Sequence, residues 1–186
     1  ILQSSIFNSF ITICTYFFFK NLGLKNLAST FYSLSFSILA NPSMGTAFVD
    51  HYSTFFSLIA LYCFFFGIKK EKSIYWFLLP ILLFFAFLSK QTPSSYVILL
   101  IIFMTTIYFF TFKKVYFLKP LILGSVFCIS FLAIFLIVNN IRFLDFFIQY
   151  FLFPQTIGSS RFESYDLNFF NTILNFKFIY ILLLPL

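Results

Sequence analysis

The sequence predicts an all-helical protein that crosses a lipid bilayer about seven times. Hydrophobic residues make up 61% of the 186 residues and charged residues only 9%, and the mean hydropathy is +1.01. A water-soluble domain needs more polar residues than this to cover its surface. The charged residues also occur in short clusters that divide the chain into apolar runs. These observations together place the chain in a membrane.

The apolar runs are long enough, or nearly so, for one membrane helix each, since a span needs about 20 apolar residues and about 17 at the least. Helices are expected because a strand that faces lipid leaves backbone groups unpaired, and because strict alternation of apolar and polar residues is absent. The expected spans cover approximately residues 1–19, 27–41, 53–68, 74–89, 94–112, 119–138 and 172–186.

Residues 1–186 are expected to form a single transmembrane domain that is a piece of a longer one. The first residue is Ile1 rather than methionine, and the chain stops inside the apolar run "YILLLPL". We therefore expect further sequence both before and after this piece.

Basic residues are unevenly divided between the two sides of the expected spans. The connections after the first, third and fifth spans hold eight lysines and one acid, whereas the opposite side holds four basic and four acidic residues. Basic residues accumulate on the cytoplasmic side of membrane proteins, so the lysine-rich connections are expected inside. This topology explains the formal net charge of +7, and because the basic residues form no continuous face we expect no nucleic-acid partner.

The long polar stretch 139–171 is expected on the outer side. It starts with the amphipathic segment "NNIRFLDFFIQYFLF" and becomes polar at "PQTIGSSRFESYD". We expect the first part to lie at the membrane surface and the second part to form a loop. A loop of this length either covers a functional site or merely connects two spans, and both interpretations stay open.

Two expected spans of nearly equal length bring polar residues together on the outer side. The runs 53–68 and 74–89 are joined by the inner turn "GIKKEKS", and at 1.5 Å per residue each climbs roughly 25 Å. Asp50 and His51 before the first run and Lys90 after the second are therefore expected at the same height. Because packed helices lie about 8 to 10 Å apart, these side chains are expected to face one pocket.

An acid, an imidazole and an ammonium at the outer membrane boundary suit chemistry on a lipid-linked phosphate. A sugar that leaves an isoprenoid phosphate deposits negative charge there, which Lys90, Arg161 and His51 could bind. Asp50 is the expected catalytic residue, because a carboxylate can take a proton from the attacking hydroxyl. Asp50 could also orient the substrate or, together with His51, bind a divalent metal ion; no other cofactor is indicated.

Each of these residues also has a purely structural interpretation. Asp50 precedes a helix and can cap its free amide groups, while Lys90 at a helix end can extend its ammonium into the headgroups. His51 can be a neutral residue of the interface, and Arg161 can belong to a solvated loop. The height that Asp50, His51 and Lys90 are expected to share is what favours a functional site.

Several short motifs follow one another along the first 112 residues. A basic turn, "YFFFKNLGLKN", precedes a span that ends at a proline, "SLSFSILANPS", and an outer loop with an acid, "FVDHYS". An inner basic turn with a tryptophan, "KKEKSIYWF", then leads to a span that ends in lysine and proline, "FAFLSKQTP". This order resembles the middle of glycosyltransferases of the GT-C superfamily, in the branch similar to dolichyl-phosphate-mannose protein mannosyltransferases and bacterial lipid A or core sugar transferases.

The resemblance implies an inverting membrane enzyme that transfers a sugar from a polyprenyl-phosphate donor to a glycan, lipid or protein acceptor of the cell envelope. Its site would face the non-cytoplasmic side, here expected to be the periplasmic side of a bacterial inner membrane. By position, Asp50 matches the acid of the family's second outer loop, and Lys90 matches the basic residue that ends the later outward helix. The family's main catalytic acid lies in an earlier outer loop, which would precede Ile1.

Two other functions compete with sugar transfer. A transporter or permease often carries paired broken helices with Gly or Pro at mid-membrane and buried ionisable groups, whereas the five glycines here are scattered and the charges avoid the span centres. An O-antigen polymerase or ligase would carry Arg and His in a large outer loop; Arg161 is present, but the stretch 139–171 has no histidine. Sugar transfer from a lipid carrier is therefore the predicted function.

Overall fold

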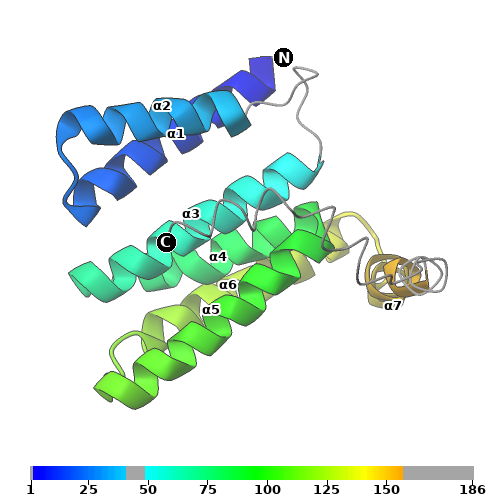
Figure 1. Cartoon of the computed structure of the whole chain (residues 1–186). Helices are drawn as coiled ribbons and strands as arrows, with labels where there is room; N and C mark the ends of the chain where they lie inside the picture. The colour runs from blue at the N-terminus through cyan, green and yellow to red at the C-terminus, as the bar shows by residue number, and fades with distance from the viewer. Residues whose placement is uncertain (1, 41–48, 157–186) are drawn as a thin grey trace, which may run out of the picture. The chain divides into compact units, whose positions relative to one another are not determined.

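The computed structural model describes residues 2–40 and 49–156, and these residues form helices and no strand (Figure 1). In chain order the helices are α1 (Leu2–Leu22), α2 (Asn26–Ala40), α3 (Val49–Lys70), α4 (Ser73–Ser89), α5 (Gln91–Phe112), α6 (Leu118–Val138), α7 (Phe143–Phe147) and the π-helical turn η1 (Ile148–Leu152). Contacts divide the chain into two compact units, Ile1–Leu132 and Ala133–Leu186. The predicted partners Asp50 and Lys90 both belong to the first unit.

Four of the described helices, α1, α3, α5 and α6, are long and apolar enough to cross a membrane. They have 21 or 22 residues each, which matches the thickness of a bilayer at about 1.5 Å per residue. Helix α4 is apolar but has only 17 residues, and α2 has 15. The expected run 172–186 lies outside the described residues. The all-helical membrane class is thus confirmed, whereas the expected number of seven spans is not.

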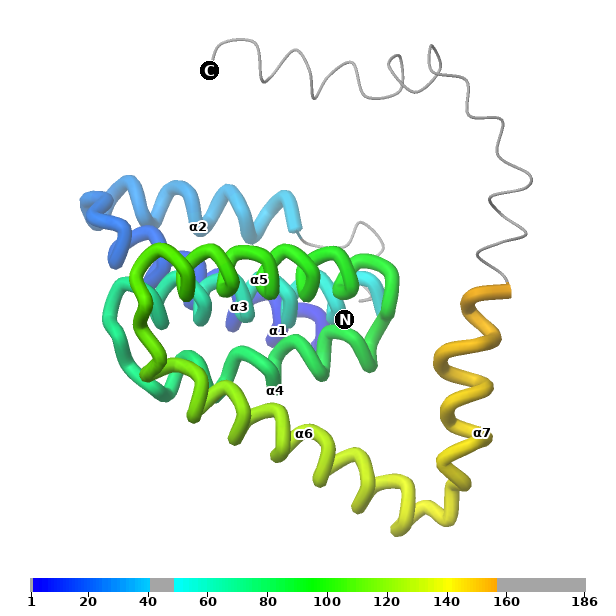
Figure 2. The backbone as a smooth tube through the Cα atoms, turned by 90° about the horizontal axis from the view of Figure 1, so that it is seen from below, coloured from blue at the N-terminus to red at the C-terminus, as the bar shows by residue number. Residues whose placement is uncertain are grey.

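Helices α3, α4 and α5 pack side by side in the first unit, and their contacts form its core (Figure 2). The buried cluster contains Ala60, Phe64, Trp76, Leu79, Ile101, Tyr108 and Phe117. The ring of Trp76 lies 4.8 Å from that of Phe117 and 5.7 Å from that of Phe64, centroid to centroid. Lipid tails are as apolar as these side chains, so the close fit of the rings, rather than their hydrophobicity, holds the helices together.

Two glycines allow neighbouring helices to approach α4 closely. A Cβ atom on Gly67 of α3 would lie 2.9 Å from the indole ring of Trp76, and one on Gly124 of α6 would lie 2.6 Å from Cγ of Pro80. Small residues at helix contacts are common in membrane proteins because they let the backbones come together. Gly67 and Gly124 therefore set the depth at which α3 and α6 pack on α4.

Polar side chains join α1 to its neighbours. Asn8 Nδ2 donates hydrogen bonds to the carbonyl oxygen and the hydroxyl of Ser37 in α2, at 3.0 and 3.1 Å. The Thr15 hydroxyl lies 2.9 Å from the hydroxyl of Tyr62 in α3, and the Tyr62 ring stacks on Phe18 with the centroids 4.2 Å apart. Hydrogen bonds between membrane helices contribute only about 0.6 kcal/mol each on average. Their main effect is therefore to fix how α1 is aligned with α2 and α3.

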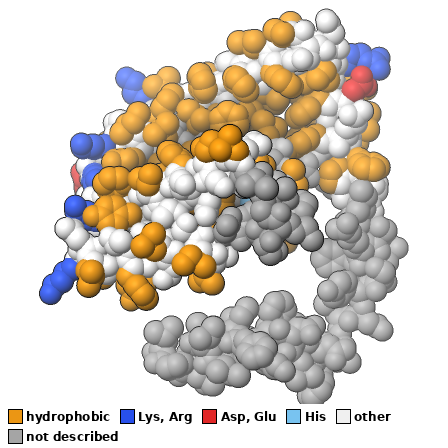
Figure 3. All heavy atoms as spheres, turned by 90° about the horizontal axis from the view of Figure 1, so that it is seen from above, with side chains coloured by type: hydrophobic (Ala, Val, Ile, Leu, Met, Phe, Trp, Pro, Cys, Tyr) orange, Lys and Arg blue, Asp and Glu red, His pale blue; other side chains and the backbone are white. Residues whose placement is uncertain are grey.

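The lysines in and next to the connections after α1, α3 and α5 gather at one end of the first unit, seen along the left of Figure 3, which we call the lysine end. They are Lys20, Lys25, Lys69, Lys70, Lys72, Lys113, Lys114 and Lys119. Lys69 donates a hydrogen bond to the backbone of Asn21, and Lys114 pairs with Glu71. The three connections thus meet on one side, as their alternation along the chain predicts. The opposite end, where α3 begins and α4 ends, is called the Asp50 end.

The described part of the second unit is a helical segment rich in aromatic residues. The rings of Phe143, Phe147 and Phe151 stack in sequence, with centroids 6.5 and 5.2 Å apart. Arg142 Nε donates a hydrogen bond to a carboxylate oxygen of Asp145 at 2.8 Å. The segment that the sequence predicts to be amphipathic is therefore helical from Phe143, and residues 157–171 lie outside the described residues.

Candidate functional site

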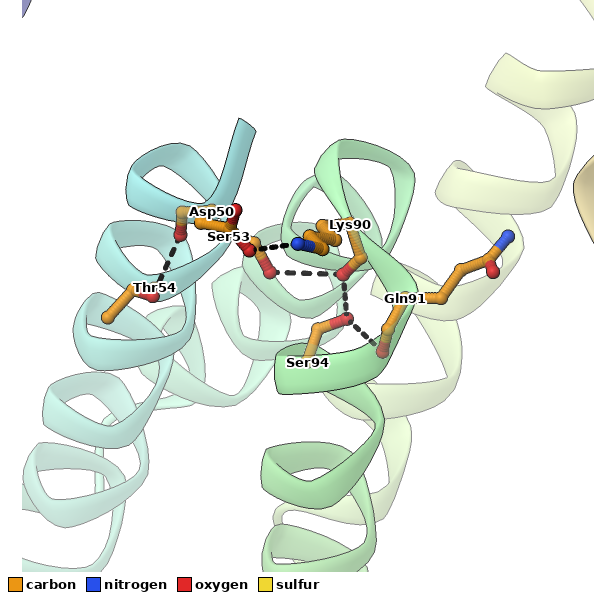
Figure 4. A network of polar contacts seen from close by, with 6 residues as sticks. All are labelled: Asp50, Ser53, Thr54, Lys90, Gln91 and Ser94. Atoms are coloured by element: carbon orange, nitrogen blue, oxygen red, sulfur yellow. Dashed lines mark hydrogen bonds and ion pairs between the residues drawn. The ribbon is translucent and has the colours of Figure 1, made fainter. Parts of the chain in front are cut away.

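The predicted site lies where α3 begins and where α4 passes into α5 (Figure 4). Lys90 is the one residue between these two helices, and its backbone is extended, with φ −159° and ψ 132°. Its N–H still donates a hydrogen bond to the carbonyl oxygen of Ala86 at 3.1 Å, which closes the last turn of α4. A single extended residue therefore both connects the two helices and carries the ammonium group.

The structure brings Asp50 and Lys90 together as an ion pair between α3 and the junction of α4 and α5. Their side chains are 53% and 41% exposed, respectively. An ion pair with this much exposure contributes only about 0 to 1 kcal/mol to stability. The pair is therefore a weak structural bond, and either charged group can exchange its partner for a ligand.

The carbonyl oxygen of Lys90 accepts hydrogen bonds from two buried serines. Ser53 Oγ of α3 donates to it at 3.0 Å, and Ser94 Oγ of α5 lies 2.6 Å from it and 3.0 Å from the carbonyl oxygen of Gln91. Both serines are fully buried. Asp50 and Ser53 lie three residues apart on α3, so they share one side of that helix. Helix α3 therefore contacts both the side chain and the backbone of Lys90.

His51 and Arg161, the other predicted phosphate ligands, are placed differently. His51 follows Asp50 on α3 and is half-buried, and consecutive side chains leave a helix about 100° apart. The side chain of His51 therefore leaves α3 in a different direction from that of Asp50. Arg161 lies outside the described residues. Within the described part of the chain, no third His, Cys, Asp or Glu stands beside Asp50 and His51 to complete a metal site.

An apolar groove of about 570 Å³ lies between α4, α5 and α6. Its lining includes Phe87 of α4, Ile98 of α5 and Ile129 of α6. Grooves of about 300 to 1,000 Å³ are large enough for small organic ligands. Phe87 precedes Lys90 by three residues, which is close to one helical turn. The last turn of α4 thus carries an apolar groove residue, and the ammonium-bearing residue follows directly after that helix.

Ser53 and Ser94 are residues of this site that the sequence pattern does not single out. The apolar run after Lys90 predicts a helix from about residue 94, whereas α5 begins at Gln91. The only available signal was the spacing, because one serine follows Asp50 by three positions and the other follows Lys90 by four. The spacing alone does not show that Ser53 reaches Lys90, because this depends on which side of α3 faces the junction.

Comparisons with protein families, with characterised proteins and with solved structures find no match to this chain. The geometry of the Asp50 end and the pattern of the sequence are therefore the basis for assigning a function.

Proposed function

We propose that the chain is part of a membrane glycosyltransferase that moves a sugar from a polyprenyl-phosphate donor to a glycan, lipid or protein acceptor. The observation that carries the proposal is the ion pair between Asp50 and Lys90 at one end of the helices. An acidic and a basic side chain that are 40 residues apart in the sequence meet at the end of the helices that we assign to the membrane boundary, where the phosphate of a lipid carrier would lie. The order of the sequence motifs supports the same assignment.

The proposed reaction uses the two members of the pair in turn. The arriving phosphate competes with Asp50 for the Lys90 ammonium, and the carboxylate is then free to bind the acceptor hydroxyl. The acceptor oxygen forms a bond to the anomeric carbon, while the bond from that carbon to the phosphate oxygen breaks. The hydroxyl proton goes to a carboxylate, and the electron pair of the broken bond stays on the phosphate, where Lys90 stabilises it. Asp50 holds the acceptor and is the carboxylate that lies beside the Lys90 ammonium.

The groove between α4, α5 and α6 supports a substrate with a hydrocarbon chain. Its lining is almost entirely apolar, and Phe87 of this lining lies three residues before Lys90. A lipid carrier needs this combination, since its phosphate must meet a cation at the membrane surface while its tail stays among apolar side chains. We place the site on the periplasmic side of a bacterial inner membrane, because the opposite end of the first unit carries the lysines that mark a cytoplasmic face.

Transport is a less well supported function. Ion-coupled transporters use ionisable groups inside their spans. In the described helices that are long enough to span, the charged residues lie in the first or last turns, as with Asp50 in α3, Lys20 in α1 and Lys119 in α6. This distribution favours chemistry at the membrane surface.

The decisive experiment compares the two ion pairs of the first unit. In the full chain, Asp50→Asn and Lys90→Ala are each expected to reduce sugar transfer from a polyprenyl-phosphate sugar by about 100-fold, because a proton acceptor and a cation at the phosphate each contribute at least this much. Glu71→Gln and Lys114→Ala are the matched controls, since that pair has almost the same exposure, 52% and 41%. Release of the lipid phosphate from membranes measures the activity.

Membrane insertion of all four variants must match that of the wild type. Unchanged transfer in both Asp50→Asn and Lys90→Ala would remove the pair from the active site. Equal losses of sugar transfer in the variants of the two ion pairs would show that the loss comes from a less stable protein and not from the active site.

A further inference from the structure

We propose that Ser53 is a positioning residue that holds the Lys90 ammonium against Asp50 by fixing the backbone of Lys90, with Ser94 as its second support. The catalytic part of this inference rests on the proposed function. The positional part does not, because it concerns only how one residue between two helices is held in place.

The backbone at Lys90 needs an external constraint. Lys90 is extended, and the ladders of the two helices hold it only through its N–H, which donates to Ala86, and through its carbonyl, which as the N-cap carbonyl begins the ladder of α5. No side-chain cap holds the start of α5 at Lys90. The direction of the Lys90 side chain therefore depends on contacts made by its peptide group, and the carbonyl oxygen makes two of them.

The two serines differ in what they can fix. Ser94 bonds back to a carbonyl four residues earlier in the chain, a common local pattern for serine in helices, which Ser95 repeats with Gln91 at 2.7 Å. Ser53 instead crosses from α3 over 37 residues of sequence. Only Ser53 ties the junction to the helix that carries Asp50.

The hydrogen bond of Ser53 is not a general property of buried serines in these helices. Ser57 lies one turn further along α3 and is also buried, yet its hydroxyl has no hydrogen-bond partner. Ser29 of α2 is fully buried with an unpartnered hydroxyl as well. The contact between Ser53 and Lys90 is therefore specific to the position where α3 meets the junction, and Ser57 provides a matched control.

Chemical cross-linking tests the positional part directly. Asp50→Cys and Lys90→Cys are introduced together in the full chain, and their reaction with a short bifunctional thiol reagent is followed in membranes. Chains with either cysteine alone account for reactions of Cys14, Cys63 and Cys128. Adding Ser53→Ala is expected to slow cross-linking about threefold to tenfold, the range for losing one hydrogen bond between membrane helices. Adding Ser57→Ala is expected to leave the rate unchanged.

Sugar transfer provides the second measurement, with Asp50 and Lys90 intact. Ser53→Ala is expected to lower kcat by a similar factor with little change in KM, and Ser53→Thr, which keeps the hydroxyl, is expected to restore most of it. An unchanged cross-linking rate in Ser53→Ala, an equal effect of Ser57→Ala, or a failure of Ser53→Thr to restore the contact would each overturn the inference. Slower cross-linking, combined with full sugar transfer by Asp50→Asn, would instead support the positioning role and reject the proposed function.

Discussion

The two ends of the first unit carry ion pairs that are nearly identical in themselves. Asp50 pairs with Lys90 at one end and Glu71 with Lys114 at the other, and the acidic and basic side chains are exposed to almost the same degree, 53% and 41% against 52% and 41%. Each pair joins two connections or helix ends that are far apart in the sequence. The pairs alone therefore give no reason to assign a function to one end rather than to the other.

Their surroundings separate the two pairs. The lysine end has an aromatic core beside it: Trp76 is fully buried, and the Tyr116 hydroxyl donates to the carbonyl oxygen of Gly67 at 3.0 Å. Its turns use left-handed residues, with φ of 52° at both Glu71 and Lys113. The Asp50 end adds the buried hydroxyls of Ser53 and Ser94 to its ring contacts, and an extended residue, Lys90, connects its two helices.

The surroundings of an ion pair can therefore suit the same two charged groups to different roles. At the lysine end, an anion meets many competing cations above a rigid aromatic core, which suits attachment to the negatively charged leaflet of a membrane. At the Asp50 end, an anion meets a lysine whose backbone is anchored in one place, which suits the recognition of a single ligand.

The largest expected effect tests whether packing strength is concentrated at the lysine end. Trp76→Ala should lower the free energy of unfolding by about 3 to 5 kcal/mol, because it removes the ring that contacts Phe64, Tyr108 and Phe117. Titration with a denaturing detergent measures the loss. Trp76→Phe should cost much less, since the indole N–H has no hydrogen-bond partner. A small effect of Trp76→Ala would mean that the two ends do not differ in packing.

The next largest effect is expected when the acidic and basic residues of a pair exchange positions. Exchanging Asp50 and Lys90 keeps an ion pair at the junction but puts the carboxylate on the extended residue. Sugar transfer should fall about 100-fold, because the cation no longer lies where negative charge develops.

The same exchange of Glu71 and Lys114 should leave transfer close to that of the wild type, because only the charges at a surface are reversed. Assays of the two exchanged variants side by side in membranes check this contrast. Retained activity after the exchange at the Asp50 end would argue against separate roles for the two groups.

The smallest expected effect is the coupling energy within each pair. Double-mutant cycles with Asp50→Asn and Lys90→Ala, and with Glu71→Gln and Lys114→Ala, should each give about 1 kcal/mol or less in unfolding experiments, decreasing with added salt. A coupling of several kcal/mol at the Asp50 end alone would show that this pair is a structural element, and it would weaken the case for ligand exchange.

Much of the helical arrangement could be predicted from the sequence because charged residues must stay near helix ends in a membrane. The apolar runs give helices where they were expected from residues 2 to 138, and the similar lengths of α3 and α4 place Asp50 and Lys90 at the same end. The number of spans could not be predicted in this way, since α2, with 15 residues, is shorter than a bilayer requires.

The details of the site depend on features that a linear pattern does not contain. The bond from Ser53 to Lys90 requires a particular rotation of α3, and that rotation is set by contacts such as Gly67 on Trp76, far along the same helix. His51 lies at nearly the same level along α3 as Asp50, but its side chain leaves the helix in a different direction. The level of a residue along a span can be predicted by counting residues, whereas the direction of its side chain depends on how the whole helix packs.

The one-residue connection at Lys90 has a further mechanical consequence. Helices α4 and α5 meet there without a flexible loop, so the connection limits how far the start of α5 can move from the end of α4. Inserting a single extended residue at this point would lengthen the connection by about 3.5 Å and would carry Ile98 and Ile101 away from their places in the groove. The length of this connection is therefore as strict a requirement as the identity of any side chain around it.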